Sequence, residues 1–184
     1  MKPIVLVSHC LLNPFSKVRD DKEPEDTGPL IAWLMKNRIG IIQLKCPETV
    51  IYGLKRWGHV REQFDTQHYR KVSRALLSET IDEVKDYTKN DCRLLAVIGI
   101  DGSPSCGIRC SCSSASWGGE ISLIQNPEEI KQIEYCRLPG IFMEELRNLL
   151  NENGIKTALL AYRSNAVAAL LAELQNELES AAAV

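Results

Sequence analysis

The chain has 184 residues, of which 45% are hydrophobic, and this is enough for one substantial core but not for two. A formal net charge of −2, with Lys and Arg spread along the chain, gives no electrostatic reason to expect a nucleic acid partner. No apolar run reaches the length of a membrane span, and the first residues lack the pattern of a signal peptide. We therefore expect one domain over residues 1–184, cytoplasmic and without a membrane or nucleic acid partner; the oligomeric state stays open.

The first part of the chain predicts two strands and a helix. Residues 3–7 are uniformly apolar, which is typical of a central strand covered on both faces. The polar stretch 13–29, with its charges gathered at 20–26, indicates a solvated loop that lies over a site. A helix is expected from Pro29 to Arg38, followed by a short strand over 40–44.

Residues 49–64 predict a loop with both stacking surfaces and cationic donors. Tyr52 and Trp57 stand among Lys55, Arg56 and His59, a mixture that suits the rim of a site for a small aromatic or anionic ligand. Arg56 is our candidate for substrate binding here. An ordinary surface loop anchored by Trp57 explains the same residues equally well.

The rest of the chain continues the alternation of helices and strands. A long amphipathic helix is expected from Asp65–Thr66 to about Thr88, then a strand over 93–101 and an irregular loop over 108–119. A short helical turn at 126–129, a helix over 140–153, a strand over 155–162 and a final helix over 164–178 follow in order. This order predicts βαβ units and hence an α/β fold, a Rossmann-like domain whose mostly parallel sheet has helices on both faces.

Three of the seven cysteines stand directly after predicted strands. They are Cys10, Cys46 and Cys106. This position matters because open parallel sheets bind their ligands beyond the carboxyl ends of the strands. If the first and third strands are neighbours and the second lies beside the first, the three thiols meet at one edge of the sheet. In a reducing compartment such cysteines are more often free thiols, metal ligands or catalytic groups than disulfides.

Three thiolates placed close together need a chemical reason, because they repel one another and burial raises their pKa values further. A bound metal centre removes this conflict, and thiolates favour zinc or iron–sulfur clusters. The chain contains no CxxC pair, so zinc is the weaker alternative. Three cysteine ligands leave one coordination position open to water or substrate.

Four short motifs resemble those of the thiouracil desulfidase-like family. They are Val-Ser-His-Cys-Leu-Leu-Asn at 7–13, Cys-Pro-Glu at 46–48, Phe-Asp-Thr at 64–66 and Gly-Ser-Pro-Ser-Cys-Gly at 102–107. The resemblance covers about the first three-fifths of the chain. It implies an enzyme with a 4Fe-4S cluster held by Cys10, Cys46 and Cys106, whose open iron takes sulfur from a small thiocarbonyl partner such as a thiolated nucleobase.

The same resemblance implies roles for residues beside the three cysteines. Glu48 would be the general acid or base, and Ser103 would bind the substrate or relay a proton. Ser105, next to a ligand, is a second candidate for substrate binding. Each has an ordinary explanation as well: Glu48 as a carboxylate at a helix start, and the two serines as turn caps.

The sequence also departs from the family pattern. Asn13 replaces a usual glycine, and the stretches 15–19 and 52–58 differ from the usual loop sequences. These changes fall in the expected substrate loops and leave the three cysteines intact, so a related thiocarbonyl compound is a better expectation than thiouracil itself. A non-catalytic metal-binding or redox-sensing protein is the alternative.

Four cysteines lie outside the proposed ligand set. We interpret Cys92 and Cys136 as small buried hydrophobic residues. Whether Cys110 and Cys112 join the site stays open. His9 would point away from Cys10 if the strand continued through both residues, which favours a structural role.

Overall fold

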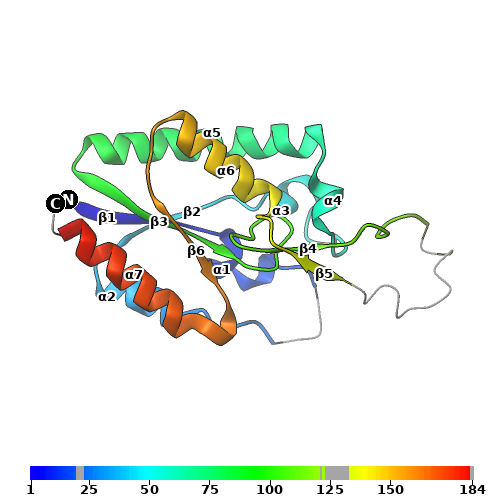
Figure 1. Ribbon diagram of the computed structural model, residues 1–184, viewed down its shortest axis with the longest axis horizontal. Coiled ribbons are helices and arrows are strands. Elements are labelled where there is room, and N and C mark those ends of the chain that lie inside the picture. The colour runs from blue at the N-terminus through cyan, green and yellow to red at the C-terminus, as the bar shows by residue number, and fades with distance from the viewer. Residues whose placement is uncertain (20–22, 121, 123–132, 183–184) are drawn as a thin grey trace.

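The computed structural model describes residues 1–19, 23–120, 122 and 133–182. The charges at 20–22 and the helical turn expected at 126–129 lie outside these residues. A parallel sheet of four strands forms the centre, in the order β2 (Gly40–Gln43), β1 (Lys2–Val7), β3 (Cys92–Ile100) and β6 (Ala158–Tyr162) (Figure 1). The α/β architecture with a mostly parallel sheet is confirmed, and so is the expected position of the first strand between the second and the third.

Helices cover both faces of this sheet. The pair α5 (Gln67–Lys89) and α6 (Ile141–Glu152) lies on one face, and α2 (Gly28–Lys36) and α7 (Val167–Ala182) lie on the other (Figure 1). Successive residues of β1 serve the two cores in turn: Ile4 and Leu6 pack toward α5 and α6, whereas Val5 and Val7 pack toward α2 and α7. A strand buried on both faces is apolar throughout, as this segment is.

The long helix α5 begins as expected, because the side chain of Thr66 accepts a hydrogen bond from the amide of Tyr69 at 3.2 Å. The pattern predicts a buried face of Val72, Leu76, Ile81 and Val84, and this is confirmed for Ile81 and Val84, whereas Val72 and Leu76 are only half-buried. Tyr69 and Leu77 are buried as well. The helix therefore presents the ring of Tyr69 to the interior at its first turn.

Short elements gather at the carboxyl edge of the sheet, where the loop prediction for 49–64 was wrong. The segment contains α3 (Pro47–Tyr52) and α4 (Arg61–Phe64), which are too short for a periodic hydrophobic pattern to show. After β1 the chain turns at once into α1 (His9–Leu12) and η1 (Pro14–Ser16). The strand alternation expected for His9 therefore does not apply, because His9 is already helical.

A second, two-stranded antiparallel sheet pairs β4 (Ser111–Ser113) with β5 (Glu134–Cys136). The expected irregular loop thus contains a short strand. A final 3₁₀ turn, η4 (Ser164–Ala166), joins β6 to α7. None of the helices in the described part of the chain has the length and apolar character needed to cross a membrane.

Candidate functional site

The structure brings Cys10, Cys46 and Cys106 to the carboxyl edge of the sheet. Cys10 lies in α1 after β1, Cys46 precedes α3 after β2, and Cys106 lies in the loop after β3. All three thiols are free; Cys46 and Cys106 are buried, and Cys10 is half-buried. Because β2, β1 and β3 are neighbours in the sheet, the three residues follow adjacent strand ends.

The three thiols lie close enough for their charges to interact. Desolvation raises the pKa of the Cys10 thiol to about 12, and the charge of Cys46 contributes to this rise. Burial also raises the pKa of Cys106 well above its usual value, and the charges of Cys10, Cys46 and Glu48 act in the same direction. Negative charge on these sulfurs is thus disfavoured unless a cationic centre compensates for it.

Glu48 lies in the first turn of α3 and is held through both carboxylate oxygens. Arg56 Nε donates to Oε2 at 2.8 Å, and the hydroxyl of Ser105 donates to Oε1 at 2.5 Å. The guanidinium of Arg56 also donates to the carbonyl of Ser16 at 2.7 Å. All four residues are buried. Arg56, a predicted member of the site, therefore reaches it through Glu48.

The two serines of the loop after β3 have different surroundings. Ser105 is 1% exposed, and its Oγ lies 3.6 Å from the sulfur of Cys106, so this hydroxyl stands between Glu48 and the thiol. Ser103 Oγ accepts a hydrogen bond from the amide of Cys106 at 3.0 Å and lies 3.3 Å from Ser105 Oγ. Ser103 thus caps the turn, which agrees with its ordinary explanation, and keeps its own proton to donate.

The start of α6 holds the loop that carries Cys106. The amides of Gly140, Ile141 and Met143 donate to the carbonyls of Gly107, Pro104 and Ser105 at 2.9, 3.0 and 3.1 Å. These are amides that a helix N-terminus leaves without intrahelical partners. A Cβ at position 140 would lie 2.3 Å from the carbonyl carbon of Ser105, so only glycine fits there. We call these three bonds the α6 clamp.

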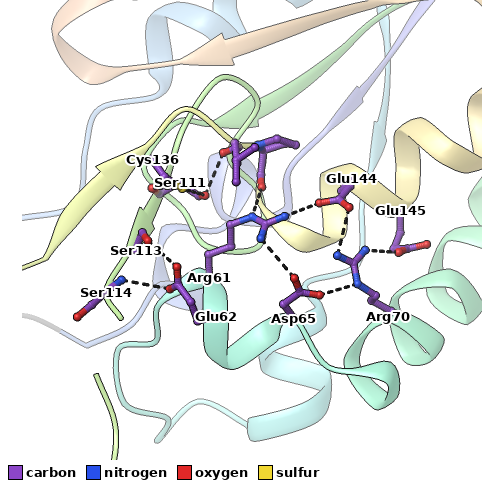
Figure 2. A network of polar contacts seen from close by, with 12 residues as sticks. Arg61, Glu62, Asp65, Arg70, Ser111, Ser113, Ser114, Cys136, Glu144 and Glu145 are labelled. Carbon is purple, nitrogen blue, oxygen red and sulfur yellow. Dashed lines mark hydrogen bonds and ion pairs between the residues drawn. The ribbon is translucent and has the colours of Figure 1, made fainter. Parts of the chain in front are cut away.

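An ion-pair network fixes the α6 clamp to the neighbouring helices (Figure 2). Arg61 of α4 donates to the carbonyl of Pro139 at 3.0 Å and pairs with Glu144 at 2.5 Å. Arg70 of α5 pairs with Glu144 and with Glu145, at 3.1 and 2.6 Å. Because ion pairs join α4 and α5 to the first turn of α6, these two helices stabilise the Cys106 loop through the α6 clamp.

A stack of four rings runs beside Glu48. Tyr52 stacks on His59 with centroids 4.8 Å apart, His59 contacts Phe64 at 4.9 Å, and Phe64 stacks on Tyr69 at 4.4 Å. Burial lowers the pKa of His59, which favours its neutral form. Trp57 is 77% exposed, so this ring does not anchor the segment as one interpretation of the sequence had it.

Of the other four cysteines, Cys92 lies in the core, and Cys110, Cys112 and Cys136 lie on or beside the two-stranded sheet. Cys92 is buried in the core between the sheet and α5, as expected. Cys136 is half-buried on β5 and contacts Ser111, which does not fit the expected buried residue. Cys112 is buried; desolvation raises its pKa to about 11, and the charge of Glu48 contributes. Cys110 is half-buried, with its sulfur 3.9 Å from the guanidinium of Arg163.

A cavity of about 500 Å³ lies beside the turn that follows α1. Phe15, Lys17, Arg19, Glu23 and Glu25 are among the residues that line it. The charge of Lys17 lowers the pKa of Cys10. A second cavity, of about 430 Å³, lies at the opposite edge of the sheet beside Cys92. None of the three candidate ligands lines either cavity. The first is linked to them through Lys17, whose charge acts on Cys10.

The donor set suits a metal–sulfur group. Its three thiols are free, crowded and mutually repelling when ionised. In the described part of the chain, no three His, Cys, Asp or Glu side chains are placed so that they could hold a metal ion. In a four-iron cluster each thiolate binds its own iron, so its ligands lie farther apart than those around one ion.

The fold and the site together define a class, that of α/β proteins with cysteines gathered at the carboxyl edge of a parallel sheet. The sequence model of the family described as "Putative 2-thiouracil desulfurase" matches residues 1–125, more than half of the chain. The chain therefore belongs to this family, and the resemblance found in its motifs is confirmed.

Two relatives are similar to this chain. An uncharacterized protein of Methanocaldococcus jannaschii, MJ0003, is 37% identical over 108 residues, which are 58% of this chain and 69% of that protein. A solved structure described as the 4Fe-4S-dependent thiouracil desulfidase TudS superposes with a TM-score of 0.56 at 18% identity, over 95% of this chain and 99% of the other. At that identity the likeness supports the fold.

Sequence reasoning missed two groups of this site. Tyr69 was not singled out, although a ring in the first turn of a helix beside a motif is a usable signal. The Pro-Gly pair at 139–140 indicated only a helix start, and its contact with the Cys106 loop follows from tertiary packing.

Proposed function

We propose that this protein is a cluster-dependent desulfidase that converts a small thiocarbonyl compound and water into the corresponding carbonyl compound and hydrogen sulfide. The observation that carries the proposal is the chain of contacts from Arg56 through Glu48 and Ser105 to the sulfur of Cys106. It places a fixed carboxylate and a hydroxyl next to a candidate ligand. Membership of the desulfurase family supports the same reaction.

Cys10, Cys46 and Cys106 would hold a 4Fe-4S cluster. Bound through three thiolates, such a cluster supplies a Lewis-acidic iron without a protein ligand. Zinc has less support, because the described residues include no compact group of ligands for one ion.

The protein's own groups would then move the proton. Glu48 would accept a proton from water or return one to the departing sulfur, and the hydroxyl of Ser105 at its Oε1 gives a short path for that proton. Arg56 keeps the carboxylate oriented through Oε2. Ser103 Oγ accepts from the Cys106 amide and lies 3.3 Å from Ser105 Oγ, and its single hydroxyl proton would be donated to the substrate in place of Ser105.

The substrate would enter through the cavity that Lys17 lines. This lining combines the ring of Phe15 and the cations of Lys17 and Arg19 with the carboxylates of Glu23 and Glu25, and Lys17 pairs with Glu25 at 2.7 Å. A ring beside polar groups of both signs suits a small heterocycle that donates and accepts hydrogen bonds. The departures at 15–19 and 52–58 fall on this side of the site. They support a thiocarbonyl compound related to thiouracil as the substrate.

Anaerobic purification followed by iron and sulfide analysis tests the proposal. We expect a brown protein with iron and acid-labile sulfide that releases sulfide from 2-thiouracil or a related thio-compound and yields the carbonyl product. A colourless, zinc-loaded protein would contradict the cluster. A loaded cluster without sulfide release from any thiocarbonyl compound would favour the non-catalytic sensor.

A further inference from the structure

The hydroxyl of Tyr69 is buried without a hydrogen-bond partner among the residues that the structure describes. The whole side chain is 1% exposed. Buried hydroxyls are nearly always hydrogen-bonded, because losing water without a replacement is costly. The unpartnered hydroxyl therefore indicates that its partner is in place only when the site is occupied.

The position of the ring is fixed from several sides. The amide of Tyr69 donates to the side chain of Thr66, and the ring stacks on Phe64 with an interplanar angle of 5°. It belongs to a small apolar cluster with Ile141, beside Ile51 of α3. Tyr69 thus lies between the helix that carries Glu48 and the start of α6, which holds the Cys106 loop.

The groups that face the hydroxyl are those of the site. Burial raises the pKa of Tyr69, and the nearby charges of Glu48, Cys106 and Cys46 raise it further. A tyrosine hydroxyl with its ordinary pKa is already protonated at neutral pH. Ser105 lies close enough to lower this pKa, although no hydrogen bond of acceptable distance and angle joins it to Tyr69. Its hydroxyl donates to Glu48 and lies 3.6 Å from the sulfur of Cys106, so Tyr69 is a neighbour of the serine that contacts this sulfur. A protonated phenol among acceptors is a hydrogen-bond donor.

We propose that Tyr69 donates a hydrogen bond to the sulfur of Cys106 when that sulfur ligates the cluster, and thereby tunes the cluster's reduction potential. This inference rests on the proposed function. A hydrogen bond to a ligand sulfur stabilises the more negative, reduced state and so raises the potential. No residue of the family motifs carries this role, because Tyr69 lies outside all four of them.

The Tyr69→Phe variant tests the inference, because it removes the hydroxyl and keeps the ring. In the anaerobically reconstituted protein, we expect a reduction potential more negative than that of the wild type, measured by spectroelectrochemistry. Tyr87→Phe is the matched control, since Tyr87 lies on the same helix and is 41% exposed; its potential should equal that of the wild type.

Two outcomes would overturn the inference. One is an unchanged potential in Tyr69→Phe; the other is a raised KM for the thio-compound with an unchanged potential, which would assign the hydroxyl to the substrate. A wild-type chain that assembles no cluster would overturn the proposed function and this inference together, so the two failures are distinguishable.

The cluster-free protein gives a second measurement. Because Tyr69→Phe removes an unpartnered buried hydroxyl, the melting temperature of the cluster-free variant should equal or exceed that of the cluster-free wild type. A lower melting temperature would mean that the hydroxyl has a partner within the folded chain, which contradicts the inference.

Discussion

Arg56 and Glu48 form a buried ion pair, with 2.8 Å between Nε and Oε2 and side chains that are 3% and 10% exposed. A charge at such depth is costly unless its partner is present, so this pair ties the position of the catalytic candidate to a residue eight positions away. The pair also joins α3 to the segment that follows it.

Removing one member of this pair should therefore lower the stability of the fold. We expect Arg56→Met to lower the free energy of unfolding by about 3–5 kcal/mol, because Glu48 is left buried and unpaired. Urea unfolding of the cluster-free protein measures this. The double variant Arg56→Met, Glu48→Leu should recover most of the loss; an unfolding midpoint for Arg56→Met equal to that of the wild type would contradict the argument.

Replacing Glu48 with glutamine should separate chemistry from cluster binding. The amide keeps the shape of the side chain but cannot accept the proton, so we expect sulfide release to fall by about 10²–10⁴-fold. Iron content should stay at the wild-type level. Glu79→Gln, at a 72% exposed side chain on α5, serves as the control and should keep full activity; full activity in Glu48→Gln would refute the role.

The three candidate ligands should differ from the other cysteines in iron content. Cys10→Ser, Cys46→Ser and Cys106→Ser should each lose most of the iron and the visible absorption of the reconstituted protein, because the hydroxyl is a poor ligand for a soft metal–sulfur group. Cys92→Ser removes a thiol from the core instead. It should retain the cluster, although with lower stability, and wild-type iron in Cys106→Ser would exclude that residue as a ligand.

The α6 clamp predicts an effect at a distance from the chemistry. Gly140→Ala places a methyl group 2.3 Å from the carbonyl carbon of Ser105, so the loop or the helix must shift. We expect a loss of about 1–3 kcal/mol in stability, with reduced cluster content. Gly58→Ala is the matched control, because nothing lies within 4 Å of its added Cβ. Equal cluster content in both variants would show that the clamp does not position Cys106.

The stability of the cluster-free protein should fall in alkaline solution. The Cys10 thiol has a folded-state pKa of about 12 and an ordinary value of 9.0. Between these values the unfolded chain releases the proton and the folded chain keeps it, so stability is full below about pH 9 and declines toward pH 12. The slope is about 1.4 kcal/mol per pH unit for one such thiol. Chemical unfolding at several pH values measures it, and Cys10→Ser should show a shallower decline.

Much of the fold could be predicted from local pattern. The apolar run of β1 and the cap at Thr66 led to the correct strand and helix, and their alternation led to the parallel sheet. The three cysteines were found because each follows a strand, a relation that the sequence shows directly. The short helices α3 and α4 were missed, since a helix of one or two turns has no hydrophobic period to detect.

The site's inner connections could not be predicted in the same way. Ser105 and Glu48 are far apart in the chain, and nothing in either neighbourhood indicates that one donates to the other. The contact between Gly140 and Ser105 likewise depends on how α6 crosses the sheet. Arg56 was expected to face the substrate, and its pairing with Glu48 required the fold to be known.

The α6 clamp is made entirely of peptide groups. The position of the Cys106 loop and the sequence of the outer segments can therefore change independently. Gly140, Ile141 and Met143 bind the main chain of the Cys106 loop, so the side chains of that loop do not make these three bonds. The segments 15–19 and 52–58 belong to other elements and take no part in those bonds. Changes confined to these two segments would leave the α6 clamp intact, so in the proposed desulfidase they could alter the preferred thio-compound without displacing Cys106.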